Sequence, residues 1–146
     1  MPRHIDPLIQ FDVPRDWENR TIIAYRAPVE GDRRAPNLVV TRDDMLEDDD
    51  LMSYAQRQLD ELATQLKGFS LLSSKEQEVA GRPALSLAFT SKAQDEILIQ
   101  RLTMVPLPGR KVVTFTLTTP ESEVGRVVPL FQRMVESMTF DAEPGS

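Results

Sequence analysis

The chain has no cysteine and a single histidine, His4, among its 146 residues. The absence of cysteine excludes disulfides and thiolate metal sites. One histidine close to the N-terminus gives no histidine cluster for a metal and no basis for a nucleophile–histidine pair. No Gly-x-Gly-x-x-Gly or P-loop pattern is present either. We therefore expect a protein that is not an enzyme and that uses neither a cofactor nor a metal.

The sequence also lacks basic blocks and long apolar runs. Its formal net charge is −6 and its pI is about 4.8. Because phosphate contacts dominate nucleic-acid affinity, such a chain is not expected to bind DNA, RNA or an anionic membrane surface. No apolar run approaches the roughly 20 residues of a membrane span, and no signal-peptide core follows the N-terminus. We expect a cytoplasmic protein without membrane insertion.

What the sequence does contain is strands with apolar side chains on both faces. Along 20–27, Ile23 and Tyr25 point to one face of the predicted strand. Ile22 and Ala24 point to the other. A strand of a small antiparallel sheet usually buries only one face. Both faces of this sheet therefore need a cover, which is the first indication of a binding surface for an apolar partner.

Alternating apolar residues and turn residues predict the order of elements along the chain. The order is β-β-β-α-β-β-β-β-α, and the turns between strands are short enough for hairpins. We therefore predict a single α+β domain over 1–146, with a mostly antiparallel sheet, two main helices and loose ends at about 1–7 and 140–146. The expected strands are 9–13, 20–27, 37–42, 69–79, 84–90, 96–105 and 111–118.

Two segments have helical periodicity. The first covers about 50–67, and the acidic run 47–50 before it is interpreted as capping. The second opens at Pro120, where Pro129 either bends the helix or delays its start to Val128. The apolar stripe of the first helix is Leu51, Ala55, Leu59, Leu62 and Leu66; that of the second is Val124, Val127, Val128, Phe131, Met134, Val135 and Met138.

Several segments, taken in order, carry a resemblance to a known family. From about residue 8 to 139 the chain resembles the DcrB-like proteins of the Mog1/PsbP-type fold and, more narrowly, the Eag chaperones of bacterial type VI secretion systems. None of the matching segments is a catalytic signature. They are Phe11-x-Val13-Pro14-x-x-Trp17, Arg20-Thr21-Ile22-Ile23, Asn37 to Asp43, Tyr54-Ala55-x-Arg57-Gln58-Leu59, Leu66-x-Gly68-Phe69, Gly81-x-Pro83-Ala84, Gln100-Arg101 and Val113 to Pro120.

The resemblance implies a cytoplasmic homodimer without enzymatic activity or cofactor. Eag chaperones bind the N-terminal transmembrane helices of secreted effectors that carry a PAAR domain, often with Rhs repeats. They keep these helices soluble until the effector is loaded on the secretion spike. An exposed transmembrane helix presents enough apolar surface to drive aggregation, so the chaperone must cover it.

The resemblance also implies which residues bind the guest helix. Polar side chains are expected to reach backbone carbonyls beside small guest residues, as between membrane helices. Thr41 and Gln58 match such positions, and either Gln100 or Arg101 supplies another, because a one-residue slip in register exchanges the faces of a strand. The expected apolar cradle consists of Ile22, Ala24, Val39, Leu62, Leu66 and Leu98.

Other interpretations remain open at this stage. Leu62 and Leu66 can equally be buried in the hydrophobic core of the chain itself. Trp17 is interpreted as a residue that packs in the core or at a corner of the fold, and not as part of a ligand site. A different member of the same fold would bind a small GTPase or a photosystem through a polar surface. An enzyme or small-molecule binder would use the sheet face as a pocket. An apolar cradle distinguishes the chaperone from these alternatives.

Overall fold

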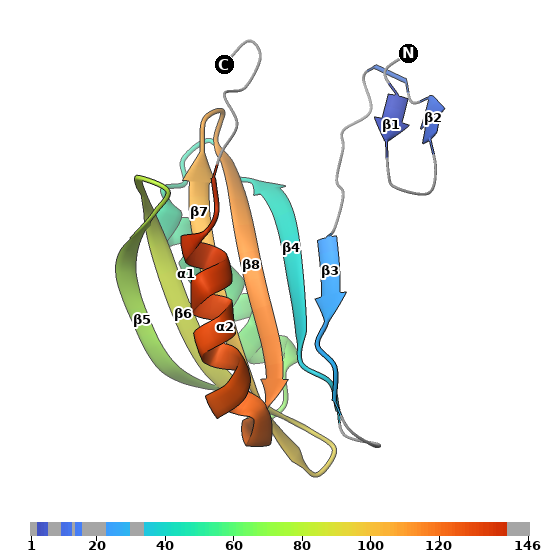
Figure 1. The fold of residues 1–146 in the computed structure, drawn as a ribbon. Helices are drawn as coiled ribbons and strands as arrows, with labels where there is room; N and C mark the ends of the chain where they lie inside the picture. The colour runs from blue at the N-terminus through green and yellow to red at the C-terminus, as the bar shows by residue number, and fades with distance from the viewer. Residues whose placement is uncertain (1–2, 6–9, 13, 16–22, 30–33, 140–146) are drawn as a thin grey trace.

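A six-stranded antiparallel sheet with one helix on each face forms the body of the protein (Figure 1). Strands β1 (Arg3–Ile5) and β2 (Gln10–Asp12) pair only with each other, as a separate two-stranded sheet. The predicted α+β class with a mostly antiparallel sheet is confirmed. Strand β1 falls in the end that we expected to be loose. The computed structural model describes residues 3–5, 10–12, 14–15, 23–29 and 34–139.

The order of strands in the main sheet is β3-β4-β8-β7-β6-β5. Strands β5 to β8 form a meander of hairpins, whereas β4 adds to the far side of β8. Helix α1 (Leu51–Gln65) connects β4 to β5 and therefore crosses the sheet. The strands are β3 (Ile23–Arg26), β4 (Asn37–Asp44), β5 (Ser70–Val79), β6 (Arg82–Ala93), β7 (Glu96–Leu107) and β8 (Lys111–Pro120).

Strands β6, β7 and β8 are longer than the sequence predicted, and the turn between β7 and β8 is shorter than the gap left between the expected strands 96–105 and 111–118. Pro106 remains in β7 opposite Val112, and the turn is confined to 108–110. Gly109 and Arg110 adopt positive φ angles of 78° and 61°, which closes this short turn. Pairing with the neighbouring strand extends the ladder past a proline that sequence reasoning treats as a stop.

The short 3-10 helix η1 (Glu121–Glu123) precedes helix α2 (Val124–Glu136). Pro129 lies inside α2, so the alternative in which this helix starts near Val128 is wrong. Proline has no N–H to donate to the carbonyl of Gly125. The buried side chains Val127, Phe131 and Val135 hold α2 against the sheet on both sides of that missing bond.

Helix α1 covers one face of the sheet, the rear face in Figure 1. Phe89 is completely buried there, and its ring centroid lies 5.0 Å from that of Phe69. The predicted stripe of α1 faces this core, which confirms it. The buried cluster is Tyr54, Ala55, Leu85, Leu87, Phe89, Leu102, Met104 and Val112, with Leu51, Leu59, Leu62 and Leu66 packed against it.

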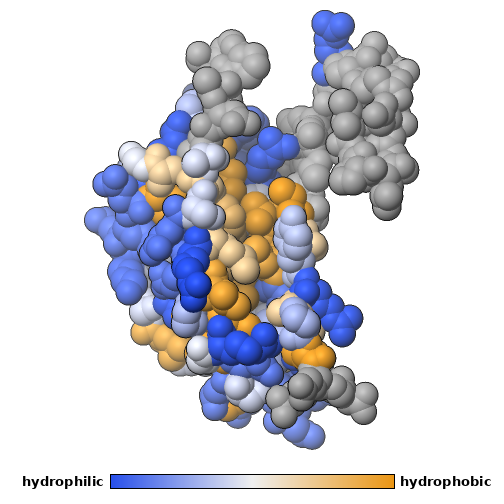
Figure 2. Space-filling view, viewed as in Figure 1, coloured by the Kyte–Doolittle hydropathy of each residue, from blue (hydrophilic) through white to orange (hydrophobic). Residues whose placement is uncertain are grey.

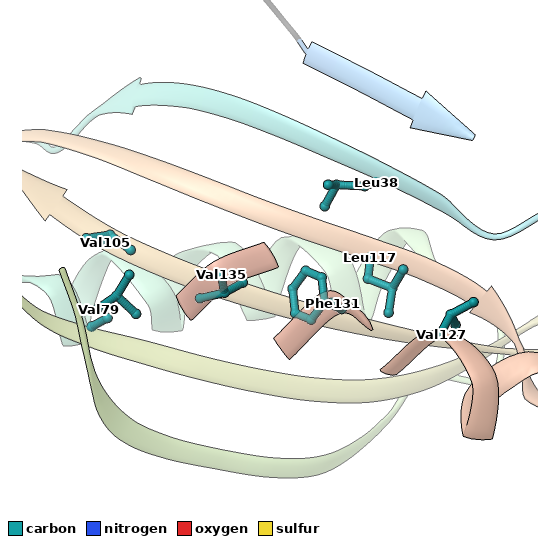
Figure 3. Packing of buried hydrophobic residues seen from close by; sticks show 8 residues of the cluster. Leu38, Val79, Val105, Leu117, Val127, Phe131 and Val135 are labelled. Carbon is teal, nitrogen blue, oxygen red and sulfur yellow. The ribbon is translucent and has the colours of Figure 1, made fainter. Parts of the chain in front are cut away.

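Helix α2 covers the opposite face. The core on this face contains side chains from α2 and from strands β4, β5, β6, β7 and β8. Figure 3 shows Leu38, Leu117 and Phe131 among them. Met134, expected on the apolar stripe of α2, is instead 48% exposed. The buried cluster is Leu38, Val79, Ala84, Val105, Leu117, Val127, Phe131 and Val135.

Candidate functional site

A groove of about 450 Å³ runs between α1 and the strands β4, β8 and β7, and we call it the polar groove. Thr41, Gln58 and Gln100, which the sequence proposed as polar contacts, all line it. Leu62 of the expected cradle lines it as well. The other lining residues are Arg42, Asp43, Tyr54, Phe89, Leu102, Met104, Thr114 and Thr116.

Strand register explains why these residues meet. In the β4–β8 ladder Thr41 lies opposite Thr114, and Val39 lies opposite Thr116. Facing residues of paired strands share a face of the sheet, so a row of threonine side chains forms the floor of the groove. Sequence reasoning proposed Thr41 but missed Thr114 and Thr116 as site residues. In the sequence, the threonines of β8 alternate with Val113 and neighbouring apolar residues. This alternation indicates that the threonines share one face of the strand.

The register also decides between Gln100 and Arg101. Gln100 pairs with Thr118, and its side-chain amide donates a hydrogen bond to Thr118 Oγ1 at 2.9 Å. Arg101 pairs with Leu117, which belongs to the core on the α2 face. Gln100 therefore lies on the side of the polar groove, and Arg101 lies on the opposite face of the sheet.

The apolar residues of the expected cradle divide into two groups. Ala24 is exposed and pairs with the half-buried Val39, on the same face as Thr116. Leu62 and Leu66 pack against the α1-side core, and Leu98 is only 9% exposed. All five lie on the α1 side of the sheet, but the leucines contribute to the core. Ile22 and Trp17 lie outside the described residues.

A second groove, of about 720 Å³, lies on the other face between α2, β3 and β4, and we call it the apolar groove. Its walls include large apolar side chains that remain exposed: Ile23 at 48%, Tyr25 at 67% and Met134 at 48%. Figure 2 shows this hydrophobic surface beside α2. The described residues that line it include none of those the sequence proposed for the cradle.

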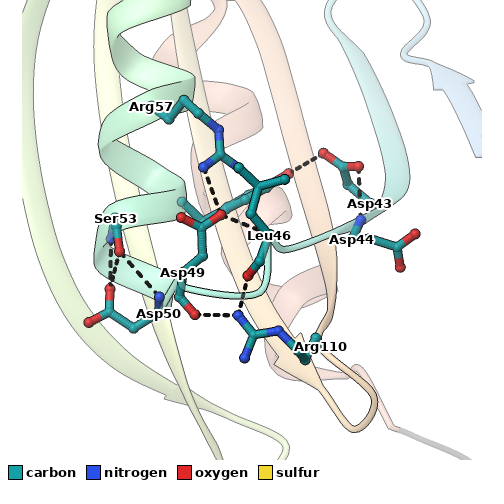
Figure 4. A network of polar contacts seen from close by, with 9 residues as sticks. Asp43, Asp44, Leu46, Asp49, Asp50, Ser53, Arg57 and Arg110 are labelled. Atoms are coloured by element: carbon teal, nitrogen blue, oxygen red, sulfur yellow. Dashed lines mark hydrogen bonds and ion pairs between the residues drawn. The ribbon is translucent and has the colours of Figure 1, made fainter.

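A network of polar contacts fixes the N-terminal end of α1 beside the polar groove (Figure 4). Asp50 caps the helix, accepting from Ser53 N at 2.8 Å, which confirms the capping interpretation of the acidic run. The guanidinium of Arg57 lies 2.7 Å from Asp49 Oδ2. This hydrogen bond holds the pKa of the Asp49 carboxyl below its usual value. Arg110 donates to the carbonyls of Leu46 and Asp49, tying the β7–β8 turn to the loop before α1.

Tyr54 and Asp43 meet at this end of the groove. The Tyr54 hydroxyl donates to Asp43 Oδ2 at 2.8 Å. Tyr54 is 3% exposed. Burial is the larger cause and the hydrogen bond to the Asp43 carboxylate the second cause that raises the pKa of its phenol well above 10.0. The guanidinium of Arg57 lies 5.5 Å from the Tyr54 ring centroid. The groove thus combines hydroxyls and amides along its length with one carboxylate.

The described part of the chain contains no group of three or more histidine, cysteine, aspartate or glutamate side chains that is arranged to hold a metal ion. Within the same residues, no helix is both long and apolar enough to cross a membrane. The polar groove offers amide and hydroxyl groups, together with Arg42 and Asp43, beside leucine side chains. This combination suits a partner that presents apolar side chains together with accessible backbone carbonyls.

Comparison with known proteins identifies the family. Residues 9–135 match the profile of the DcrB family. The chain belongs to the DcrB family. The chain is also similar to the Pseudomonas aeruginosa protein named Effector EagT6. The two share 24% identity over 128 residues, which is 88% of each chain. The resemblance to DcrB-like and Eag proteins stated from the sequence is confirmed.

Solved structures confirm the fold of this DcrB-family chain. A Pseudomonas aeruginosa protein of unknown function, PA94, superposes with a TM-score of 0.81 at 22% identity, covering 98% of this chain and 99% of that one. LpqN from Mycobacterium tuberculosis, described as involved in cell envelope biogenesis, has a TM-score of 0.63 at 13% identity and 85% and 86% coverage. The PsbP protein of Synechocystis, CyanoP, has a TM-score of 0.52 at 17% identity and 95% and 92% coverage. These similarities show only that the chain has the Mog1/PsbP-type fold.

Proposed function

We propose that this chain is a cytoplasmic chaperone of a type VI secretion effector. In this proposal it binds and shields the N-terminal transmembrane helices of an effector with a PAAR domain, often with Rhs repeats, until the effector is loaded on the secretion spike. The similarity to Effector EagT6 supports the association with type VI secretion. The proposal assigns the chain no catalytic activity and no cofactor.

One observation carries the proposed binding site. Thr41, Gln58 and Gln100, from a strand, a helix and another strand, converge on a single groove. A transmembrane helix with small residues leaves backbone carbonyls accessible, and amide and hydroxyl donors can reach them. The exposed Ala24 and the half-buried Val39 extend this face toward the edge strand β3.

A homodimer is part of the proposal. A membrane-spanning helix is about 30 Å long, whereas α1, the wall of the polar groove, has 15 residues and is about 22 Å long. One copy therefore covers only part of the length and circumference of such a guest. Two copies would enclose more of the apolar surface than one.

Neighbouring residues of β3 provide a matched test. Ala24 shares a face with Val39 and Thr116, whereas Tyr25 pairs with Leu38 on the face of the apolar groove. We would co-express the chain with the N-terminal region of the effector encoded beside it and measure the soluble complex by size-exclusion chromatography with light scattering. Ala24→Asp and Tyr25→Asp would be compared with the wild type, and circular dichroism would verify their folding.

The proposal predicts a soluble complex with two copies of this chain for each effector fragment. Ala24→Asp should abolish it, because an unpaired carboxylate would face apolar guest side chains. Tyr25→Asp should leave the effector fragment soluble. An insoluble effector beside an unaccompanied monomer would contradict the chaperone function and favour an accessory protein with a polar docking surface. If Tyr25→Asp abolished the complex and Ala24→Asp did not, the guest would bind in the apolar groove and not in the polar groove.

A further inference from the structure

Strand β5 forms an open edge of the main sheet. Among the strands that the structure describes it pairs with β6 alone, and it lies at the outer side of the sheet in Figure 1. It has 10 residues, and all of those from Ser70 to Glu76 are exposed. On an edge strand, alternate residues direct their backbone N–H and C=O groups away from the sheet. This strand therefore offers a row of backbone groups along which another strand can pair.

The side chains of β5 change character along its length. At one end, Leu71 and Leu72 are 47% and 58% exposed. Toward the other end, Glu76 pairs with Leu85, which is buried on the α1 side, and Glu78 shares the face of Glu76 by alternation. Neither glutamate forms an ion pair with any residue that the structure describes. The open edge thus has an apolar end and an acidic end.

A groove of about 590 Å³ lies where β5 approaches the start of α1, and we call it the acidic groove. Asp50, Glu76 and Glu78 contribute carboxylates to it, and its apolar lining includes Met52, which is 54% exposed, and Pro106. No lysine, arginine or histidine is among the described residues that line it. A lysine or arginine can lie with its alkyl stem along apolar side chains while its charged group reaches a carboxylate. The acidic groove therefore suits a basic side chain.

The cations of the β5–β6 hairpin point to the other face of the sheet. Lys75 pairs with Ser86, which alternates with Leu85 of the α1-side core, so Lys75 lies on the α2 face. Arg82 pairs with Val79, which is buried in the α2-side core. A basic side chain that enters the acidic groove therefore meets the carboxylates without a cation of this hairpin on the same face.

A second copy of this chain does not match this edge. Antiparallel pairing of two β5 strands about a two-fold axis places residues of the same face opposite each other. Glu76 and Glu78 would then meet serine, leucine or glutamate of the other copy and never Lys75. Like charges directly opposite each other destabilise a sheet, whereas opposite charges stabilise it. The charges on this edge therefore discourage pairing between copies and favour a basic strand.

We propose that the β5 edge and the acidic groove dock an extended segment of a partner protein, which adds to the sheet as a further strand. This segment carries lysine or arginine at two alternate positions, matching the spacing of Glu76 and Glu78, and large apolar residues nearer its other end. In strand addition, backbone hydrogen bonds supply affinity and alternate side chains supply specificity. The acidic groove shares no described lining residue with the polar groove, so this inference goes beyond the proposed chaperone function and does not depend on it.

The test uses a fluorescent probe peptide of 10 residues, the length of β5. Every described pair of neighbouring strands in this sheet is antiparallel. The probe therefore has its two alternate lysines before its two leucines. Fluorescence anisotropy measures its binding to the full chain, and hydrogen exchange of the β5 amides locates it. Two further probes are methylated on alternate sets of backbone nitrogens, and a third has glutamates in place of the lysines.

Two double variants separate the edge from general charge. Glu76→Gln with Glu78→Gln removes two carboxylates from the edge. Glu121→Gln with Glu136→Gln removes the same charge from exposed positions beside and within α2 and is the matched control. Glu76→Lys with Glu78→Lys reverses the charge of the edge. Circular dichroism verifies that each variant is folded.

We expect the wild type to bind the lysine probe and to gain protection of β5 amides. Glu76→Gln with Glu78→Gln should weaken binding by about fivefold, as for two exposed cross-strand ion pairs, whereas the control variant should not. The glutamate probe should bind only the charge-reversed variant. Methylation of one set of nitrogens should abolish binding and methylation of the other set should not, because only one set faces β5.

Several results would overturn this docking surface. They are failure of the wild type to bind the lysine probe, equal effects of the two methylated sets, equal losses in the edge and control variants, and protection of amides outside β5 alone. None of them bears on the chaperone function, which is tested separately by the soluble complex with the effector fragment.

Discussion

The side-chain amide of Gln100 donates a hydrogen bond to Thr118 Oγ1 across β7 and β8, at 2.9 Å. This bond holds the amide on the face of the sheet that carries the polar groove, while the next residue, Arg101, lies on the other face. Two adjacent residues of one strand therefore have different expected effects on guest binding.

Gln100→Ala should weaken binding of the effector fragment by about three- to tenfold, since it removes one hydrogen-bonding group from the groove, worth about 1 kcal/mol. Arg101→Ala should leave the affinity within about twofold of the wild type. Titration calorimetry with the effector fragment fused to a soluble carrier protein measures both. Equal losses in the two variants would contradict the assignment of faces.

The buried Phe89 should contribute strongly to the stability of the fold. Phe89→Ala removes a fully buried ring that packs against Phe69, and we expect the free energy of unfolding to fall by about 4 kcal/mol. Urea unfolding followed by circular dichroism measures this loss. The exposed Leu72→Ala on the edge strand is the control and should change it by less than about 0.5 kcal/mol.

The helix cap predicted from the acidic run is also testable. Asp50→Ala removes the acceptor of the Ser53 N–H and should lower the melting temperature by a few degrees. The bonds from Ser53 depress the pKa of Asp50 in the folded chain, so the contribution of the cap is present above pH 3.8 and is lost as the pH falls below it. Asp48→Ala, at an exposed position in the same run, should have no comparable effect. Equal melting temperatures for the wild type and Asp50→Ala at neutral pH would contradict the prediction.

Tyr54 should make the protein sensitive to alkali. Its phenol has a pKa raised above 10.0 in the folded chain, so above pH 10 the unfolded chain loses a proton that the folded chain retains. The free energy of unfolding should therefore fall as the pH rises above 10. With Tyr25→Phe, Tyr54 is the only tyrosine, and its absorbance at high pH should change together with unfolding. Ionisation of Tyr54 in a chain that is still folded near pH 10 would contradict this.

Local periodicity explains which parts of this fold the sequence could predict. The spacing of Leu51, Ala55 and Leu62 set the buried side of α1, and alternation through β8 set the face of Thr114 and Thr116. These patterns repeat within a single element, so they do not depend on which other element lies nearby.

Non-local pairing explains what the sequence left open. The face of Gln100 depends on the β6–β7 turn, where only Gln94 and Asp95 separate paired residues and Gln94 has a φ of 57°. The contact of Tyr54 with Asp43 depends on how α1 crosses the sheet. The exposed apolar groove depends on the packing of α2 against β4, which leaves Met134 outside the core. None of these relationships repeats along the chain, so periodicity carries no signal for them.

The most direct test of the polar groove as the guest-binding face is site-specific photo-cross-linking from β3. A benzophenone amino acid at position 24 lies on the same face as Val39 and Thr116, and one at position 25 replaces the exposed Tyr25 on the opposite face. In the complex with the effector fragment, we predict a strong cross-link to the apolar guest helix from position 24 and little from position 25. A guest cross-link from position 25 with none from position 24 would contradict the account.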